Sequence, residues 1–68
     1  MPDTCAAIID LLVARRREKG LTQRDLAKAA NLAQPAIARL ESKSVIPQLD
    51  TLLKVAAALE CKLEIVPY

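Results

Sequence analysis

The side chains that do most enzyme chemistry are scarce in this sequence of 68 residues. Histidine is absent, glycine occurs once, and the two cysteines, Cys5 and Cys61, lie near opposite ends. A nucleophile with its base, a glycine-rich phosphate loop and a zinc site of cysteine and histidine each need residues that this pattern lacks. We therefore expect no enzymatic activity, no cofactor and no metal. The polar side chains that remain are suited to binding.

The two cysteines leave two interpretations open. One is a single disulfide between Cys5 and Cys61; the other, which we favour, is a pair of reduced, partly buried thiols in a cytosolic protein. A chain this short buries a smaller fraction of its surface than a larger domain does, and chains of this size usually gain stability from disulfides, a metal or a partner. We expect a second subunit to supply it here.

No segment approaches the length of a membrane span. The longest apolar stretch near the start, residues 6–14, is interrupted by Asp10 and follows no basic leader. The expectation is a cytoplasmic, unprocessed protein that makes no use of a membrane.

Charge is distributed unevenly along the chain, although the net charge is only +2. Residues 1–44 hold eight basic and five acidic side chains, whereas residues 45–68 hold two basic and three acidic ones. The positive half is the one that contains the candidate nucleic-acid-binding helices described below. This distribution favours a nucleic-acid partner for that half.

The first element that must position these residues is a helix. It is predicted to begin at Asp3 or Thr4, either of which can cap it, and to end at Gly20, which supplies a left-handed stop. Its apolar face continues one turn further through Arg16 and comprises Cys5, Ile8, Ile9 and Leu12.

Two short helices follow closely. Thr22 and Asp25 resemble a capping box at the start of the second helix, and Asn31 tolerates the left-handed conformation that would end it. The third helix begins at Gln34. Its inward residues are Ile37 and Leu40, and its outward residues are Gln34, Ala36, Ala38 and Arg39. Two helices separated by three or four residues form a helix-turn-helix.

The last third of the sequence predicts a loop over residues 42–47, a fourth helix from Gln48 or Leu49 to Leu59, and a strand over residues 61–66. The apolar stripe expected on this helix, which would form core and some dimer interface, is Leu49, Leu52, Leu53, Ala56 and Leu59. The strand is predicted from the alternation of apolar and charged residues after Glu60. A lone strand needs a hydrogen-bonding partner, and the same strand of a second subunit provides one. The prediction is one domain over residues 1–68, all-α with four helices, whose short C-terminal β-strand pairs across a homodimer.

Residues 15–59 resemble the lambda-repressor-like helix-turn-helix regulators, also called XRE or Cro type. The resemblance depends on several pieces in order: Gly20-Leu21-Thr22-Gln23, Leu26-Ala27, Gln34 to Ile37, Arg39-Leu40-Glu41, Pro47, and Leu49 with Thr51-Leu52-Leu53. The C-terminal strand resembles that of antitoxin-type regulators of the HipB and HigA kind. Such proteins bind their own operator as dimers and often bind a toxin as well.

The resemblance implies a role for each matching residue. The third helix would lie in the major groove, with base contacts from Gln34, Pro35, Ala36 and, one turn on, Arg39. Glutamine suits adenine and arginine suits guanine. Phosphate contacts are implied for Thr22, Gln23, Ser42, Lys43 and Ser44. Arg16 and Glu41 match a charged pair that ties the first helix to the third.

Three departures from the family pattern affect this interpretation. Asn31 replaces the usual glycine of the turn, which the left-handed tolerance of asparagine permits. Lys43 replaces the glycine that usually follows the third helix, so that this loop is open to another path. Val45 and Ile46 replace basic or polar residues, which weakens the phosphate contact there, and they instead face the partner subunit, as do Leu63 and Ile65.

The expected function is sequence-specific binding of double-stranded DNA by a homodimeric transcriptional repressor. Its palindromic operator would place two recognition helices about one DNA turn, roughly 34 Å, apart. Two alternatives remain: an antitoxin that binds a toxin and autoregulates its operon, and an interaction module that has lost DNA binding. Arg39 has the alternatives of a phosphate or an acidic neighbour, and the basic cluster at residues 15–19 is either a solvated helix end or a DNA contact.

Overall fold

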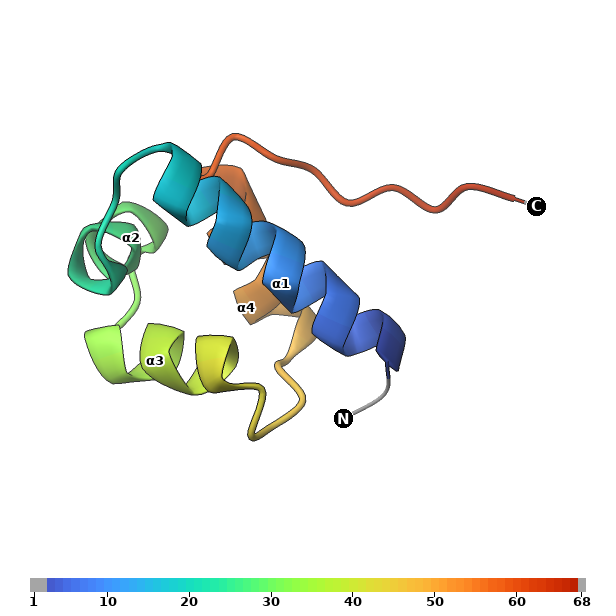
Figure 1. Cartoon of the computed structure of the whole chain (residues 1–68), viewed down its shortest axis with the longest axis horizontal. Coiled ribbons are helices and arrows are strands. Elements are labelled where there is room, and N and C mark those ends of the chain that lie inside the picture. Colours follow the sequence, from blue (N-terminus) through green and yellow to red (C-terminus); the bar gives the residue numbers. More distant parts are fainter. Residues whose placement is uncertain (1–2, 68) are drawn as a thin grey trace.

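The structure is a computed structural model that describes residues 3–67, and within them it contains four α-helices (Figure 1). Of the predicted domain 1–68, residues 1, 2 and 68 lie outside the described residues. The helices are α1 (Asp3–Glu18), α2 (Gln23–Ala30), α3 (Gln34–Ser42) and α4 (Leu49–Ala58). The predicted all-α, four-helix class is confirmed, and the expected helix bounds agree to within one or two residues. None of these helices is both long enough and apolar enough to cross a bilayer.

The turns between the helices form where the sequence predicts them. Gly20 has a φ of 70°, a left-handed conformation that costs an L-residue with a side chain about 1–2 kcal/mol. Thr22 and Asp25 form the capping box: the Thr22 side chain accepts from the Asp25 N–H at 3.0 Å, and Asp25 accepts from the Thr22 N–H at 3.0 Å. Asn31 ends α2 with a φ of 57°. These local signals set the short turn between α2 and α3.

The hydrophobic core lies where α2 packs against α3 and α4, and α1 against α3. Its largest fully buried side chains come from all four helices and the residue after α4: Ile9, Leu26, Ile37, Val55 and Leu59. In α3, burial of Ile37 and Leu40 fixes the rotation of the helix about its axis. The opposite side of α3 therefore faces outward.

The buried face of α4 differs from the predicted stripe. Ala56 and Leu59 are buried as expected, and Leu52 is half-buried, but Leu49 is 67% exposed and Leu53 is 45% exposed. The other helices of so small a domain cover only the side of α4 that carries Val55, Ala56 and Leu59. Leu49 and Leu53 therefore do not belong to the core of the single chain, and a single chain does not test the dimer-interface part of the prediction.

The strand predicted for residues 61–66 is also absent from the single chain. After α4, residues 61–67 run as a segment without helix or strand, and they extend away from the helices toward the C-terminus (Figure 1). A strand requires a neighbour with which to exchange hydrogen bonds. Within residues 3–67, the chain offers no other strand for that purpose. The predicted pairing across a homodimer needs a second chain, so the single chain does not test it.

The loop after α3 follows a left-handed path. Lys43 has a φ of 60° and a ψ of 22°, and its N–H bonds to the carbonyl oxygen of Leu40 at 3.2 Å. Lys43 thus ends α3 in the left-handed conformation that a glycine would adopt.

Candidate nucleic-acid interface

The N-terminal end of α3 presents polar groups to solvent. Gln34, Pro35 and Arg39 are exposed, and Ala36 is half-buried. Ala33 caps the helix without a side-chain hydrogen bond, so the first N–H groups of α3 lack a side-chain acceptor. The positive end of the helix dipole lies at the same place. Pro35 has no N–H, and the Ala36 N–H donates to the Ala33 carbonyl oxygen at 2.9 Å, so the backbone donor left at the start of α3 is the N–H of Gln34, beside its exposed side-chain amide.

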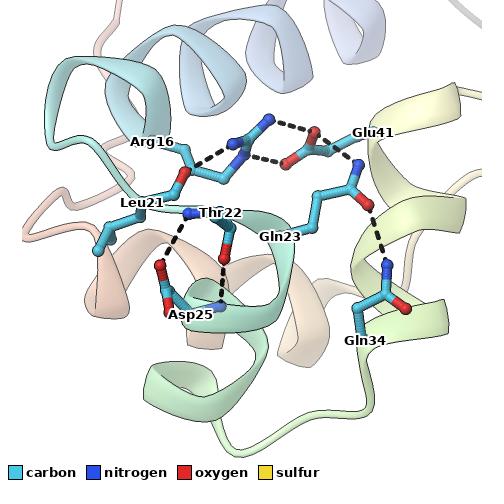
Figure 2. Close-up of polar contacts among 7 residues, drawn as sticks. All are labelled: Arg16, Leu21, Thr22, Gln23, Asp25, Gln34 and Glu41. Carbon is cyan, nitrogen blue, oxygen red and sulfur yellow. Dashed lines mark hydrogen bonds and ion pairs between the residues drawn. The ribbon is translucent and has the colours of Figure 1, made fainter.

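A nearly buried ion pair lies behind this face and joins α1 to α3 (Figure 2). Arg16 Nε lies 2.7 Å from Glu41 Oε2, and Arg16 Nη2 donates to Glu41 Oε1 at 3.0 Å. The two side chains are only 12% and 9% exposed. Arg16 Nη1 also donates to the carbonyl oxygen of Leu21 at 2.7 Å. Both carboxylate oxygens of Glu41 and three guanidinium nitrogens of Arg16 are thus satisfied, which such burial demands.

Gln23 links this ion pair to the exposed end of α3. Its Nε2 donates to Glu41 Oε1 at 3.2 Å, and its Oε1 accepts from Gln34 Nε2 at 3.1 Å (Figure 2). The chain of contacts therefore runs from Arg16 through Glu41 and Gln23 to Gln34. It leaves Gln34 with its Oε1 acceptor and its second N–H donor unoccupied by these contacts. An acceptor and a donor side by side are what the N6 and N7 positions of adenine require.

The residues predicted to contact phosphate lie around the same face, and they differ in which of their hydrogen-bonding groups are already used within the chain. Thr22 uses its hydroxyl oxygen as an acceptor in the capping box, which leaves its O–H as a donor. The Gln23 side chain is committed to Glu41 and Gln34, so only its backbone N–H at the start of α2 remains for an anion.

The other predicted phosphate contacts lie at the C-terminal end of α3. Ser42 Oγ donates to the Arg39 carbonyl oxygen at 2.8 Å and lies 2.8 Å from Ser44 Oγ. Lys43 Nζ lies 2.7 Å from Asp10 Oδ1 on α1. Both members of this pair are substantially exposed, so a phosphate would compete with Asp10 for the ammonium group.

Arg39 borders a shallow hollow of about 260 Å³ between α3 and the start of α4. Val45 and Ile46 line it together with Arg39, and both are exposed. Ile46 also borders a smaller apolar hollow with Ile8 and Leu52. These two residues, predicted to face a partner subunit, therefore lie between the Arg39 side and the α1–α4 side of the molecule.

Leu63 and Ile65, the other residues predicted at a subunit interface, border a hollow that shares Ile8 and Leu52 with the one beside Ile46. This apolar hollow of about 400 Å³ is lined in addition by Leu49 and Leu53. Ile65 is fully exposed, and Leu63 is 38% exposed. This side gathers most of the large apolar side chains that the single chain leaves uncovered.

The basic cluster at the end of α1 is engaged within the chain. Arg15 Nε donates to the carbonyl oxygen of Leu59 at 3.1 Å, and Lys19 pairs with Glu60. The ammonium group of Lys19 donates to the Glu60 carboxylate and lowers its pKa below the ordinary value. Arg15 and Lys19 therefore tie α1 to the end of α4, whereas Arg17 is exposed at the helix end.

Acidic residues and cysteines do not gather into a metal centre. Among residues 3–67, no group of three or more side chains of the usual ligand types lies close enough to hold an ion. Cys5 and Cys61 carry free thiols, and both are half-buried.

Two features of this face were not predicted from the sequence. One is the role of Gln23 as the link between Glu41 and Gln34, and the other is the pairing of Lys43 with Asp10. Gln23 and Gln34 face each other because the turn brings the starts of α2 and α3 together. The helix-turn-helix spacing is the sequence signal from which the contact between Gln23 and Gln34 could have been predicted.

Comparisons with known proteins agree with this geometry. A family model described as helix-turn-helix matches residues 12–66. An uncharacterized HTH-type transcriptional regulator of Haemophilus influenzae is 43% identical over 61 residues, which are 90% of this chain and 62% of that protein. Antitoxin HigA1 of Mycobacterium tuberculosis is 34% identical over 59 residues, which are 87% of this chain and 40% of that protein. The chain thus spans about three fifths of one relative's length and two fifths of the other's.

A solved structure shows the same arrangement of helices. A chain described as a toxin-antitoxin module from Streptococcus pneumoniae superposes with a TM-score of 0.80 and is 45% identical; the match covers 96% of this chain and 71% of that one. The predicted resemblance is confirmed. On the family match, the sequence identities and the superposition, the chain belongs to the XRE-type helix-turn-helix family.

Proposed function

We propose that this chain reads a palindromic DNA operator as a homodimer and acts as a transcriptional repressor. The observation that carries the proposal is the hydrogen-bonded chain from the nearly buried Arg16–Glu41 pair through Gln23 to Gln34. A base-reading side chain on a mobile stem loses rotamer entropy when it binds, whereas one held by neighbours has already lost most of it. Gln34 is held in this way at the exposed start of α3.

The proposal assigns the remaining residues of the face by their position. Gln34, Pro35 and Ala36 enter the major groove, and Arg39 follows one turn later with a guanidinium suited to guanine. The backbone N–H groups at the start of α2 and the side chains of Thr22, Ser42, Ser44 and Lys43 contact phosphates. No catalytic step is involved, in keeping with a family that is generally non-enzymatic. Such a protein would work in the cytoplasm, where the DNA is.

The experiment that tests the proposal is selection of bound sites from a random duplex pool at near-physiological salt, followed by measured affinity for the selected site. The expected result is an inverted repeat whose half-sites are about one DNA turn apart. Gln34→Ala should weaken specific binding by about 30-fold or more, because it removes one bidentate base contact of roughly 1–3 kcal/mol from each of the two half-sites. Binding to unrelated DNA should change little, since that binding depends on phosphate contacts.

A variant of Arg39 and a control variant of Lys54 test whether Arg39 reads a base. Arg39→Lys keeps the positive charge but cannot form the bidentate contact with guanine. Lys54→Ala removes one positive charge from an exposed position on α4. Arg39→Lys should relax preference at one base position, and Lys54→Ala should leave the preferred sequence unchanged. If no sequence is enriched and neither Gln34→Ala nor Arg39→Lys alters DNA binding, the chain is an interaction module and the proposal is wrong.

A second candidate function is supported by the relatives. One match is named antitoxin HigA1, and the superposed structure is described as a toxin-antitoxin module. An antitoxin would bind its operator through the same face and a toxin elsewhere. The distinguishing test is expression of the small protein encoded by the neighbouring gene: growth arrest that this chain relieves supports the antitoxin, and growth unaffected by that protein argues against it.

A further inference from the structure

The shallow hollow of about 260 Å³ beside Arg39 combines apolar and polar residues. Ala36 of α3 and the loop residues Val45 and Ile46 line it with apolar groups, whereas Gln48 and Thr51, at the start of α4, add polar ones. Val45 is 46% exposed and Ile46 is 65% exposed. Water covers much of both side chains in the single chain, which is unfavourable for apolar surface. An apolar group that displaces this water would therefore be bound favourably.

The hollow opens on the outward face of α3. Ala36 and Arg39 are three positions apart in the helix, so their side chains are neighbours on one face. This is the face that the proposed function places in the major groove. Val45 borders the hollow beside Arg39, and the lining residues of the smaller hollow, within residues 3–67, do not include it. Ile46 borders both hollows, so Val45 is the loop residue that belongs to the α3 side alone.

We propose that this hollow accepts the C5-methyl group of a thymine, and that Val45 determines specificity by reading this methyl group on the base pair next to the one that Arg39 reads. The inference rests on the proposed function and adds to it a base-reading residue that lies outside α3. Thymine presents its methyl group in the major groove, where the other three bases carry hydrogen-bonding groups at their edges. The Val45 side chain has neither a donor nor an acceptor, so apolar contact is the only means by which it can distinguish bases.

The Arg39 side chain forms another side of the same hollow. None of the ion pairs found among residues 3–67 includes its guanidinium group, which is therefore available to guanine O6 and N7. Its apolar stem can remain beside the hollow while the charged end reaches the base. A methyl group in the hollow would then contact the stem of Arg39 and the side chain of Val45. The preferred half-site should accordingly contain a thymine beside a guanine.

Two other occupants of the hollow would give different behaviour. A deoxyribose of the DNA backbone is also partly apolar, and contact with it would make Val45 support binding to every sequence alike. A second subunit, which the sequence led us to expect beside Val45, would make this residue change the dimer dissociation constant. A thymine methyl group is the occupant that makes binding depend on one methyl group of the DNA.

Replacing thymine with uracil in the selected operator tests the inference directly, because uracil lacks only this methyl group. Each thymine is replaced in turn at the equivalent positions of both half-sites, and the dissociation constant of the full-length chain is measured at near-physiological salt. At the position beside the guanine, the replacement should weaken binding about fourfold for each half-site and about 15-fold for both, the loss expected from uncovering one methyl group in each. A loss of less than about twofold at that position would overturn the inference.

Variants of Val45 assign the effect to this residue through a thermodynamic cycle. In Val45→Ser the penalty for uracil should fall from about 15-fold to about threefold or less, whereas Val45→Thr, which keeps one methyl group, should retain at least about fivefold. Val66→Ala is the matched control, because it shortens another exposed valine and should leave the penalty unchanged. If Val45→Ser weakens binding to the thymine and uracil operators equally, Val45 contacts a sugar or a second subunit and the inference is wrong.

5-Methylcytosine gives a second measurement on the unmodified protein. It carries a methyl group at the same place in the major groove but pairs with guanine instead of adenine. With cytosine placed at the thymine position, methylation of that cytosine in both half-sites should tighten binding about 15-fold. Methylation that leaves the affinity unchanged or weakens it contradicts a methyl group in the hollow.

The outcomes separate this inference from the proposed function. If an operator is selected but neither uracil nor Val45→Ser has the expected effect, the chain reads DNA and only the methyl contact is wrong. If no DNA sequence is enriched, the proposed function is wrong and the inference fails with it. If the penalty for uracil is found and depends on Val45, both are supported.

Discussion

Replacing Arg16 with methionine should destabilise the domain severely, because it leaves the Glu41 carboxylate buried without its cation. Removing one partner of a buried ion pair costs about 3–5 kcal/mol. The pair is 12% and 9% exposed and Arg16 also loses its bond to the Leu21 carbonyl oxygen, so we expect about 3 kcal/mol. A domain of this length has a total stability of roughly 3–10 kcal/mol. The unfolding midpoint should therefore fall by about 12–24 °C.

The assay is urea and thermal unfolding followed by circular dichroism at one fixed chain concentration, since dimerisation makes the midpoint depend on concentration. Arg17→Met is the matched control, because Arg17 is exposed and adjacent. It should change stability by no more than about 0.5 kcal/mol. The double variant Arg16→Met, Glu41→Met should recover to within about 1 kcal/mol of the parent, since an apolar pair can replace a buried ion pair at little cost.

DNA binding should separate from stability in the double variant. Gln23 loses its Glu41 acceptor there, so Gln34 is held less firmly and sequence preference should fall although the fold is restored. A loss of less than about 1 kcal/mol in Arg16→Met, or a double variant as unstable as the single one, would refute the reasoning. The first result would mean that Glu41 is hydrated, and the second that the site needs its charges to pack.

Three further perturbations have defined outcomes. Gly20→Ala should cost about 1–2 kcal/mol in urea unfolding from backbone strain alone, because φ is 70° and no atom lies within 4 Å of the added carbon; a loss near zero would contradict this. The backbone N–H of Thr22, which donates to the Asp25 carboxylate, lowers the pKa of Asp25, so the unfolded chain binds the proton more tightly and stability falls as pH drops below about 4. In Asp25→Asn the unfolding midpoint should depend less steeply on pH in that window, and an unchanged slope would exclude this cause. Asp10→Asn should free Lys43 and tighten binding to non-specific DNA by up to about fivefold at low salt in a titration, whereas weaker binding would show that Asp10 positions Lys43 for phosphate.

The helices and their turns could be predicted from the sequence, because these depend on interactions between near neighbours. Thr22 with Asp25, Gly20 and Asn31 act over a few residues of chain, and each forms where its residue type predicts. The inward residues of α3 were also predictable, since Ile37 and Leu40 lie on one side of any helix that contains them. With the helix-turn-helix spacing, these local signals were enough to predict the fold and the outward residues Gln34 and Arg39.

The packing of the helices against one another sets which apolar residues are covered and which polar groups come into contact, and neither could be predicted from local patterns. Helical period alone places Leu49 and Leu53 beside Leu52, but the packing of α2 on α4 covers the side with Val55 and leaves them exposed. The contacts from Gln23 to Gln34 and from Lys43 to Asp10 join residues 11 and 33 positions apart. Such contacts depend on the angles at which helices pack, which no local pattern specifies. The strand predicted after Glu60 is absent for a related reason. A strand forms only by hydrogen bonding to a second segment, and the single chain supplies only one of the two.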